Sequence, residues 1–135
     1  MRILAIDYGE RRTGIAVSDK MGMTAQGLDT IEVKDESEIP DIVVQNAKDT
    51  GAETIVIGLP LNMDGTESEK SRKVREFGAV LAEKTSLPVV FWDERMTSMQ
   101  AKRVMQELNK KTYRNKQLID KISATLILQE YLKTI

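Results

Sequence analysis

The sequence predicts an α/β protein with a five-stranded mixed sheet and helices on both faces. Short apolar runs of strand length recur along the chain, segments with helical periodicity separate the later runs, and a glycine-containing turn joins the first two as a hairpin. The length of 135 residues suits one compact unit, so residues 1–135 are expected to form a single domain.

The first three expected strands form an antiparallel unit. Residues 2–7 contain the apolar run Ile-Leu-Ala-Ile, residues 8–12 have the composition of a turn, and residues 13–18 continue as the second strand. A third strand is expected over about residues 24–33, and Gly27 is its weak point because glycine weakens a strand interior.

Helical periodicity begins after this unit. Ser37 is expected to cap a helix with Pro40 in its first turn, and Gly51 ends it. A fourth strand covers residues 54–58, and a loop covers residues 59–65.

The second half of the chain repeats the alternation of helix and strand. Thr66 and Glu69 have the spacing of a capping box, and the helix behind them leads to a fifth strand at residues 88–92. Thr97 with Gln100 predicts a third helix, a break follows at about residues 111–114, and the last helix covers 115–132. The expected strand order is 3-2-1-4-5, with strands 1, 4 and 5 parallel.

Composition excludes several kinds of chemistry. The sequence has no cysteine and no histidine, so disulfides, thiolate or imidazole metal sites, cysteine nucleophiles and histidine bases are all excluded. Any catalysis must therefore use carboxylates, lysine, hydroxyl groups or a bound metal ion.

Charge is distributed unevenly along the chain. The stretch from Arg95 to Lys121 holds eight basic and two acidic residues, a net charge of +6, whereas the rest holds 12 basic and 19 acidic residues, a net charge of −7. Such a stretch is typical either of a surface that binds polyanions or of two solvated helices, and charge alone does not separate these interpretations.

The sequence gives no indication of a membrane segment. The longest apolar run near the N-terminus, from Ile3 to Ile6, is interrupted by Asp7 and is too short for a secretory signal or a membrane span. A soluble cytoplasmic protein without a membrane partner is therefore expected.

Acidic residues follow two of the strands that are expected to be parallel. Asp7 ends the first strand, and Asp93 and Glu94 follow the fifth. The carboxyl ends of parallel strands form the edge at which open α/β sheets bind ligands. Two strand spacings separate these ends, roughly 9.6 Å, a gap that two acidic side chains with a pair of metal ions between them would fill.

Gly58 ends the strand expected to lie between these acids. It has no side chain, so it either keeps room for a metal or a phosphate or simply starts the turn into Leu59 and Pro60. Both interpretations remain open.

Asp120 is the third candidate acid, near the start of the last helix between Ile119 and Ile122. A partly buried aspartate needs a cation, which would be a metal ion or Lys116 four residues earlier. Carboxylates without histidine favour Mg²⁺ or Mn²⁺, and two such ions can cleave a phosphodiester without a protein base.

Four motifs together resemble one family, the YqgF family of Holliday-junction-resolvase-like proteins, also described as pre-16S rRNA nucleases. They span the chain in order and with similar spacing. The motifs are Ile6-Asp7-Tyr8-Gly9 with Thr13-Gly14 and Ala16; Gly58-Leu59-Pro60-Leu61-Asn62 with Gly65; Asp93-Glu94-Arg95 with Thr97-Ser98; and Asp120-Lys121-Ile122-Ser123-Ala124. Family members commonly have alanine where this chain has Ser123, a change that is not expected to disturb the metal site.

The resemblance implies a ribonuclease H-like fold in which Asp7, Glu94 and Asp120 are catalytic and hold the metal ions. It thereby selects Glu94 over Asp93. It also implies a cytoplasmic nuclease that processes the 5′ end of precursor 16S rRNA, with a ribosomal precursor particle as a possible partner. Two alternatives remain: cleavage of branched DNA at Holliday junctions, and a non-catalytic nucleic-acid-binding assembly factor. Junction resolvases carry an acid just after the fourth strand, where this chain has Gly58-Leu59-Pro60, so Glu94 replaces it.

Further motif residues are candidates for substrate binding, each with a structural alternative. The alternatives are a hairpin tip for the arginines at 11 and 12, turn formation for Asn62, and helix capping for the hydroxyl residues at 97 and 98. The candidates are Gly9, Arg11, Arg12, Asn62, Arg95, Thr97, Ser98, Lys116 and Lys121.

An ATP-dependent kinase of the actin and sugar-kinase class also begins with an Asp-x-Gly hairpin. Such proteins need two related lobes to enclose ATP, and this chain has the length of one. That interpretation is set aside.

Overall fold

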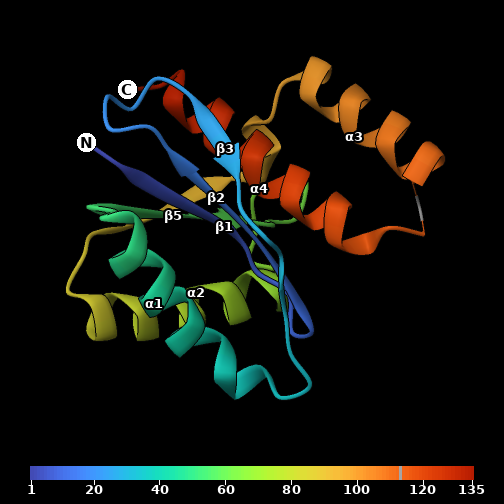
Figure 1. Cartoon of the computed structure of the whole chain (residues 1–135). Coiled ribbons are helices and arrows are strands. Elements are labelled where there is room, and N and C mark those ends of the chain that lie inside the picture. The colour runs from blue at the N-terminus through green and yellow to red at the C-terminus, as the bar shows by residue number, and fades with distance from the viewer. Residues whose placement is uncertain (113) are drawn as a thin grey trace.

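A computed structural model of the chain describes residues 1–112 and 114–135 and contains a mixed sheet with helices on both faces (Figure 1). The strands are β1 (Ile3–Asp7), β2 (Arg12–Ser18), β3 (Ala25–Gly27), β4 (Ile31–Glu32), β5 (Thr54–Leu59) and β6 (Val89–Asp93). The helices are α1 (Ile39–Thr50), α2 (Glu69–Thr85), α3 (Met99–Thr112) and α4 (Lys116–Leu132), with short 3₁₀ turns η1 (Glu36–Glu38) and η2 (Glu94–Met96).

The strand order is β3-β2-β1-β5-β6, which confirms the predicted order and the pairing directions. β1 pairs antiparallel with β2 and parallel with β5, and β5 pairs parallel with β6. The carboxyl ends of β1, β5 and β6 therefore meet at one edge of the sheet.

The predicted continuous third strand is wrong. Two short strands, β3 and β4, replace it, and both pair with β2. At the interruption the Thr30 hydroxyl donates a hydrogen bond to the Gln117 carbonyl of α4 at 2.6 Å. A Cβ on Gly27 would stand 2.7 Å from Cγ of Lys121. Contact with α4 thus decides where this edge of the sheet breaks, and the sequence pattern of residues 24–33 does not contain that information.

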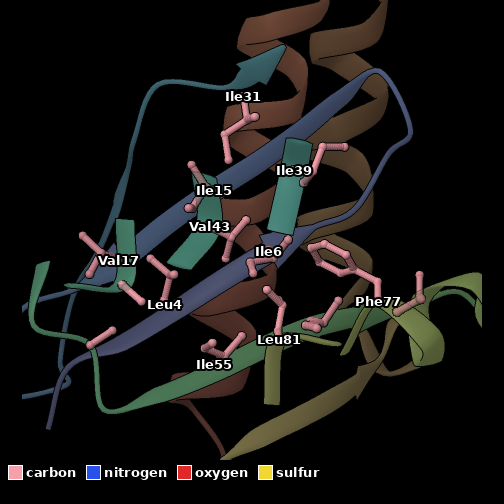
Figure 2. Close-up of a cluster of buried hydrophobic side chains, with 14 of the residues drawn as sticks. Leu4, Ile6, Ile15, Val17, Ile31, Ile39, Val43, Ile55, Phe77 and Leu81 are labelled. Atoms are coloured by element: carbon pink, nitrogen blue, oxygen red, sulfur yellow. The ribbon is translucent and has the colours of Figure 1, made fainter. Parts of the chain in front are cut away.

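The central strands are apolar because both faces of the sheet are covered. On one face Leu4, Ile6 and Ile55 pack with side chains of α1 and α2, including Val43 and Leu81 (Figure 2). Burying a side chain of this size contributes about 1.5–3 kcal/mol. The residues that alternate with these along the strands face α4. Together with residues of that helix they form a second cluster, which contains Ile3, Ala5, Ala16 and Val56 of the strands and Ala124, Ile127 and Leu128 of α4.

Two predicted helix caps are wrong by one or two residues. Asp35, not Ser37, accepts the capping hydrogen bond at the start of η1, and α1 follows directly. At α2 the capping box uses Ser68, because the Thr66 hydroxyl donates to Asp64 in the preceding loop. The end of α1 at Gly51 is confirmed, with a left-handed φ of 71°.

The last two helices lie outside the βαβ part of the fold. α4 covers the sheet, whereas α3 packs on α4 away from the strands (Figure 1). The predicted break between them is confirmed by the end of α3 at Thr112 and the start of α4 at Lys116, although Tyr113 lies outside the described residues. Within the described ranges, every helix is too short or too polar to span a bilayer.

Candidate active site

Asp7 stands between two glycines on the neighbouring strands. It ends β1 on the face that Ile3 and Ala5 direct toward α4. Gly14 of β2 is its antiparallel partner, and Gly58 of β5 lies one step beyond the Ile6–Ile57 pair. The sheet therefore carries no side chain on either side of the Asp7 carboxylate in this row.

Gly14 lets α4 approach the sheet at Asp120. A Cβ at position 14 would stand 2.0 Å from the Asp120 carbonyl oxygen and 3.4 Å from the Ala124 Cβ. Real atoms do not come within 2.0 Å of one another, so only glycine permits the seating of the helix backbone on β2. This contact places Asp120 beside Asp7.

Gly58 makes room for Glu94. A Cβ there would stand 3.2 Å from Oε1 of Glu94 and 2.7 Å from Cδ1 of Ile127. The Glu94 carboxylate, itself a candidate metal ligand, lies over Gly58, and the expectation that this glycine keeps room for a metal or a phosphate stays a prediction. The turn interpretation is wrong, since β5 continues through Gly58 to Leu59.

The structure distinguishes Glu94 from its neighbour Asp93. The Asp93 carboxylate accepts a hydrogen bond from Nη2 of Arg95 at 2.8 Å and caps η2, and these hydrogen bonds lower its pKa. Burial and, to a smaller extent, the nearby Asp7 carboxylate raise the pKa of Glu94 to about 7. Asp93 is thus engaged in local structure, while Glu94 faces Asp7.

Burial also raises the pKa of Asp7, to about 6, with the negative charge of Asp120 adding to the shift. The Lys70 ammonium group and a hydrogen bond with Ser123 lower it in part. Burial raises the pKa of Asp120 as well, against the opposing effect of Arg12. Burial therefore raises the pKa of all three carboxylates, and repulsion adds to it at Asp7, from Asp120, and at Glu94, from Asp7.

Sequence reasoning missed two residues of this site. Lys70, in the first turn of α2, lowers the pKa of Asp7, Glu94 and Asp120 alike. Ser123, one turn after Asp120 on α4, lies near enough to the Asp7 carboxylate to lower its pKa, while its hydroxyl donates to the Ile119 carbonyl oxygen at 2.9 Å. Lys70 carried no local signal, since only the packing of α2 on β5 and β6 brings it near, whereas Ser123 was visible as a departure from the family pattern.

Arg12 holds the Asp120 carboxylate. Its Nε donates to Oδ2 of Asp120 at 3.0 Å, and both side chains are partly covered, with exposures of 30% and 23%. The alternative that Lys116 pairs with Asp120 is therefore wrong. Lys116 instead lines a hollow at the start of α4.

The donor set of the three acids fits a divalent cation of the magnesium type. All the donors are carboxylate oxygens, and burial raises the pKa of each, so a bound cation would offset the cost of holding their charges away from water. Within residues 1–112 and 114–135 no three acidic side chains are gathered tightly enough to ligate one ion, and the Asp120 carboxylate is turned toward Arg12.

Two hollows with basic residues in their linings lie near the acids. One of about 520 Å³ lies beside Asp7 and is lined by Tyr8, Gly9, Glu10, Arg11, Glu69, Lys70 and Lys73. The other, of about 530 Å³, is lined by Arg12, Glu32, Arg114, Asn115, Lys116 and Gln117. The consecutive arginines 11 and 12 therefore line different hollows.

The other predicted substrate-binding residues have structural contacts. Gly9 closes the β1–β2 hairpin, where a Cβ would stand 2.3 Å from the Arg12 carbonyl oxygen. The Asn62 side chain donates to Oγ1 of Thr66 at 3.0 Å within its own loop. Lys121 lies with its aliphatic stem against Gly27 of β3.

The residues that follow Glu94 shape the start of α3. Ser98 caps this helix by accepting a hydrogen bond from the Ala101 N–H at 3.1 Å, so the predicted cap at Thr97 is displaced by one residue. The Thr97 N–H instead donates to the Glu94 carbonyl oxygen, at the end of η2. Arg95 pairs with Asp93 and extends toward the Met63 carbonyl oxygen.

The raised pKa values predict that the metal-free protein loses stability as the pH rises. Asp7 and Glu94 bind protons up to about pH 6 and about pH 7 when folded, but release them near 3.8 and 4.5 when unfolded. The folded state therefore holds more protons in this range, and its free energy of unfolding falls with pH. Between pH 5 and 8, after allowance for screening, we expect a fall on the order of 2 kcal/mol.

Urea unfolding in EDTA at pH 5, 6, 7 and 8 measures this fall. The Glu94→Gln variant should show a smaller one, because its amide does not titrate. A free energy of unfolding that rises from pH 5 to pH 8 would contradict the burial of these carboxylates.

The chain is similar in sequence to known proteins over nearly its whole length. The family model described as RuvX, Holliday junction resolvase, matches residues 1–134. A protein of Clostridium novyi (strain NT), named "Putative pre-16S rRNA nuclease", is 43% identical over 135 residues and covers 100% of both chains. One of the same name from Syntrophomonas wolfei is 46% identical over 132 residues, 98% of this chain and 94% of that one.

Solved structures of junction resolvases share the fold. Thermus thermophilus RuvC superposes with a TM-score of 0.62 at 14% identity, covering 99% of this chain and 96% of that one. The fowlpox virus Holliday junction resolvase gives a TM-score of 0.57 at 13% identity, with both chains covered completely. The predicted ribonuclease H-like fold is thereby confirmed.

Proposed function

The chain belongs to the RuvX family, which is described as Holliday junction resolvases, and from that premise we propose that it is a divalent-metal-dependent nuclease that processes precursor 16S rRNA. The observation that carries this proposal is the row Gly14–Asp7–Gly58, on which Asp120 and Glu94 converge from either side. A sheet edge that removes three carboxylates from water at a cost in stability is typical of a functional site.

Asp7, Glu94 and Asp120 would hold Mg²⁺ or Mn²⁺, with two ions as the proposed number. When bound, the ions supply an activated water and stabilise charge on the leaving oxygen. This chain's own residues perform the rest. Gly14 and Gly58 let Asp120 and Glu94 approach Asp7, because a side chain at either position would collide with them or with their backbone.

Nucleic acid is the proposed partner, and the cationic side chains on both sides of the acids support it. Arg11 and Lys70 line the hollow beside Asp7, and Arg12 and Lys116 line the hollow at the start of α4. A chain of phosphates that crosses the acids would meet cations on either side, as backbone recognition requires.

Precursor rRNA is the favoured substrate because the relatives with that name match this chain over its full length at 43–46% identity. The proposal therefore includes cleavage near the 5′ end of precursor 16S rRNA, on a ribosomal precursor particle in the cytoplasm. Junction DNA is the second candidate, supported by the description of the family model.

A side-by-side cleavage assay tests the proposal. The purified protein is incubated with a precursor 16S 5′ fragment, an unrelated single-stranded RNA and a four-way DNA junction, each with Mg²⁺, Mn²⁺ or EDTA. We expect cleavage of the precursor fragment with either metal and none in EDTA. Cleavage in EDTA would overturn the metal mechanism, and preferential cleavage of the junction would overturn the choice of RNA.

A further inference from the structure

Arg12 occupies a position between one of the proposed metal ligands and a cationic hollow. Its Nε holds Oδ2 of Asp120 at 3.0 Å, and the same side chain forms part of the wall of the hollow at the start of α4. Arg11, its neighbour in the chain, lines the other hollow. Of these two arginines, Arg12 is the one that both pairs with Asp120 and lines the hollow at the start of α4.

The hollow at the start of α4 has the chemistry of a phosphate site. Three of its six lining residues are cationic, namely Arg12, Arg114 and Lys116, against a single acid, Glu32. The Glu32 carboxylate is engaged there by the Gln117 side-chain amide. With a volume of about 530 Å³ the hollow is large enough for a phosphate group and part of its sugar.

The Arg12–Asp120 pair opposes metal binding. A carboxylate oxygen that accepts a hydrogen bond from a guanidinium group has one fewer lone pair for a cation, and the guanidinium charge repels that cation. Because both side chains are partly exposed, the pair is weak enough to exchange for another partner. A substrate phosphate is such a partner, since arginine binds phosphate and carboxylate with the same fork of donors.

We propose that Arg12 is a positioning residue that moves from Asp120 to a substrate phosphate in the hollow at the start of α4, so that nucleic acid binding frees Asp120 as a metal ligand. This inference rests on the proposed nuclease function. It assigns the hollow to a phosphate near the cleaved bond. Metal and substrate binding then strengthen each other by the same factor, as linkage requires.

Metal affinity without any nucleic acid tests the first half of this proposal. Mn²⁺ binding is measured by the loss of the free-ion electron paramagnetic resonance signal in wild-type protein and in the Arg12→Gln and Arg12→Lys variants. In Arg12→Gln the Asp120 carboxylate is released, so this variant should bind Mn²⁺ about fivefold more tightly than wild type. That factor corresponds to the free energy of a partly exposed ion pair. Arg12→Lys, which keeps the charge without the fork, should lie between the two.

Arg11→Gln is the matched control for this measurement. It removes the same charge one residue away, but Arg11 lines the other hollow and is not the partner of Asp120. Its Mn²⁺ affinity should stay within about twofold of wild type. Equal tightening in both variants would assign the effect to net charge and overturn the role of the Arg12–Asp120 pair.

RNA binding in EDTA, where the proposed metal-dependent cleavage does not occur, tests the second half. A fluorescent single-stranded RNA is titrated with each protein at several salt concentrations. Arg12→Gln should weaken binding and reduce the slope of log K against log salt by about one contact. Unchanged RNA affinity together with tighter Mn²⁺ binding would overturn the transfer to phosphate.

Failure of this proposal differs from failure of the proposed function. Unchanged or weaker Mn²⁺ binding by Arg12→Gln, in a protein that cleaves RNA with Mn²⁺, overturns the role of Arg12 alone. Absence of Mn²⁺ binding by every variant overturns the metal-dependent nuclease itself and this proposal with it.

Discussion

Replacing Asp7 by asparagine is expected to lower the rate of metal-dependent RNA cleavage by about a thousandfold or more. Asp7 is the carboxylate around which Glu94 and Asp120 gather, and an amide oxygen is a weak substitute for it as a metal ligand. Metal ions contribute several kcal/mol to such reactions, and about 4 kcal/mol corresponds to a thousandfold in rate. Single-turnover cleavage of the precursor fragment measures the loss.

The same substitution should make the metal-free protein more stable. At pH 8 the ionised Asp7 carboxylate destabilises the fold by up to about 3 kcal/mol, the difference between pKa values of about 6 and 3.8. Asparagine carries no charge and removes that cost. Loss of activity with gain of stability separates a catalytic role from unfolding, whereas full activity in Asp7→Asn would overturn the assignment of the site.

Asp49→Asn is a suitable control for this experiment. Asp49 lies on α1, where its carboxylate accepts a hydrogen bond from Gln45, far from the carboxyl edge of the sheet. The change removes the same charge by the same chemistry. Activity and stability should both remain close to wild type.

Replacing Gly14 by alanine is expected to destabilise the protein by about 3 kcal/mol. The added Cβ would stand 2.0 Å from a backbone oxygen of α4, so the helix must move away from β2. Alanine restricts the unfolded chain more than glycine, but this effect offsets only about 0.5–1 kcal/mol. Urea unfolding measures the loss, and cleavage should fall with it because Asp120 moves with the helix.

Gly58→Ala provides the matched comparison. Its added Cβ would meet the tip of Ile127 and the Glu94 carboxylate, which are side-chain atoms that can rotate aside. We therefore expect a smaller loss of stability than for Gly14→Ala, together with reduced cleavage because Glu94 is displaced. Equal stability of Gly14→Ala and wild type would contradict the close approach of α4.

The central sheet was predictable because its strands are buried on both faces. Residues 3–6 and 55–57 are apolar without alternation, as α1 and α2 cover one face and α4 the other. The split between β3 and β4 was not predictable, since it depends on contacts with α4 that are distant in sequence. The predicted helix caps were wrong for a different, local reason. Serine, threonine and aspartate residues near a helix start compete for the same backbone groups.

The candidate site was predictable as a set of acids but not as an arrangement. Strand ends placed Asp7 and Glu94 on one edge, and the family resemblance selected Glu94 over Asp93. The role of Gly14 and Gly58 depends on their lying on either side of Asp7. That placement follows from the register of three paired strands and cannot be read from one strand alone. Arg12 and Lys70 were similarly hidden, because tertiary packing alone decides which acid each of them faces.

The seating of α4 on Gly14 has a consequence for how this sequence can drift over generations. The separation of Asp120 from Asp7 is set by main-chain atoms in contact, not by the volumes of the side chains between helix and sheet. Ile127 and Leu128 can therefore exchange for apolar residues of similar size without altering the spacing of the acids. Such exchanges in the core leave the arrangement of the acids unchanged, whereas a side chain at Gly14 would move α4 away from the sheet.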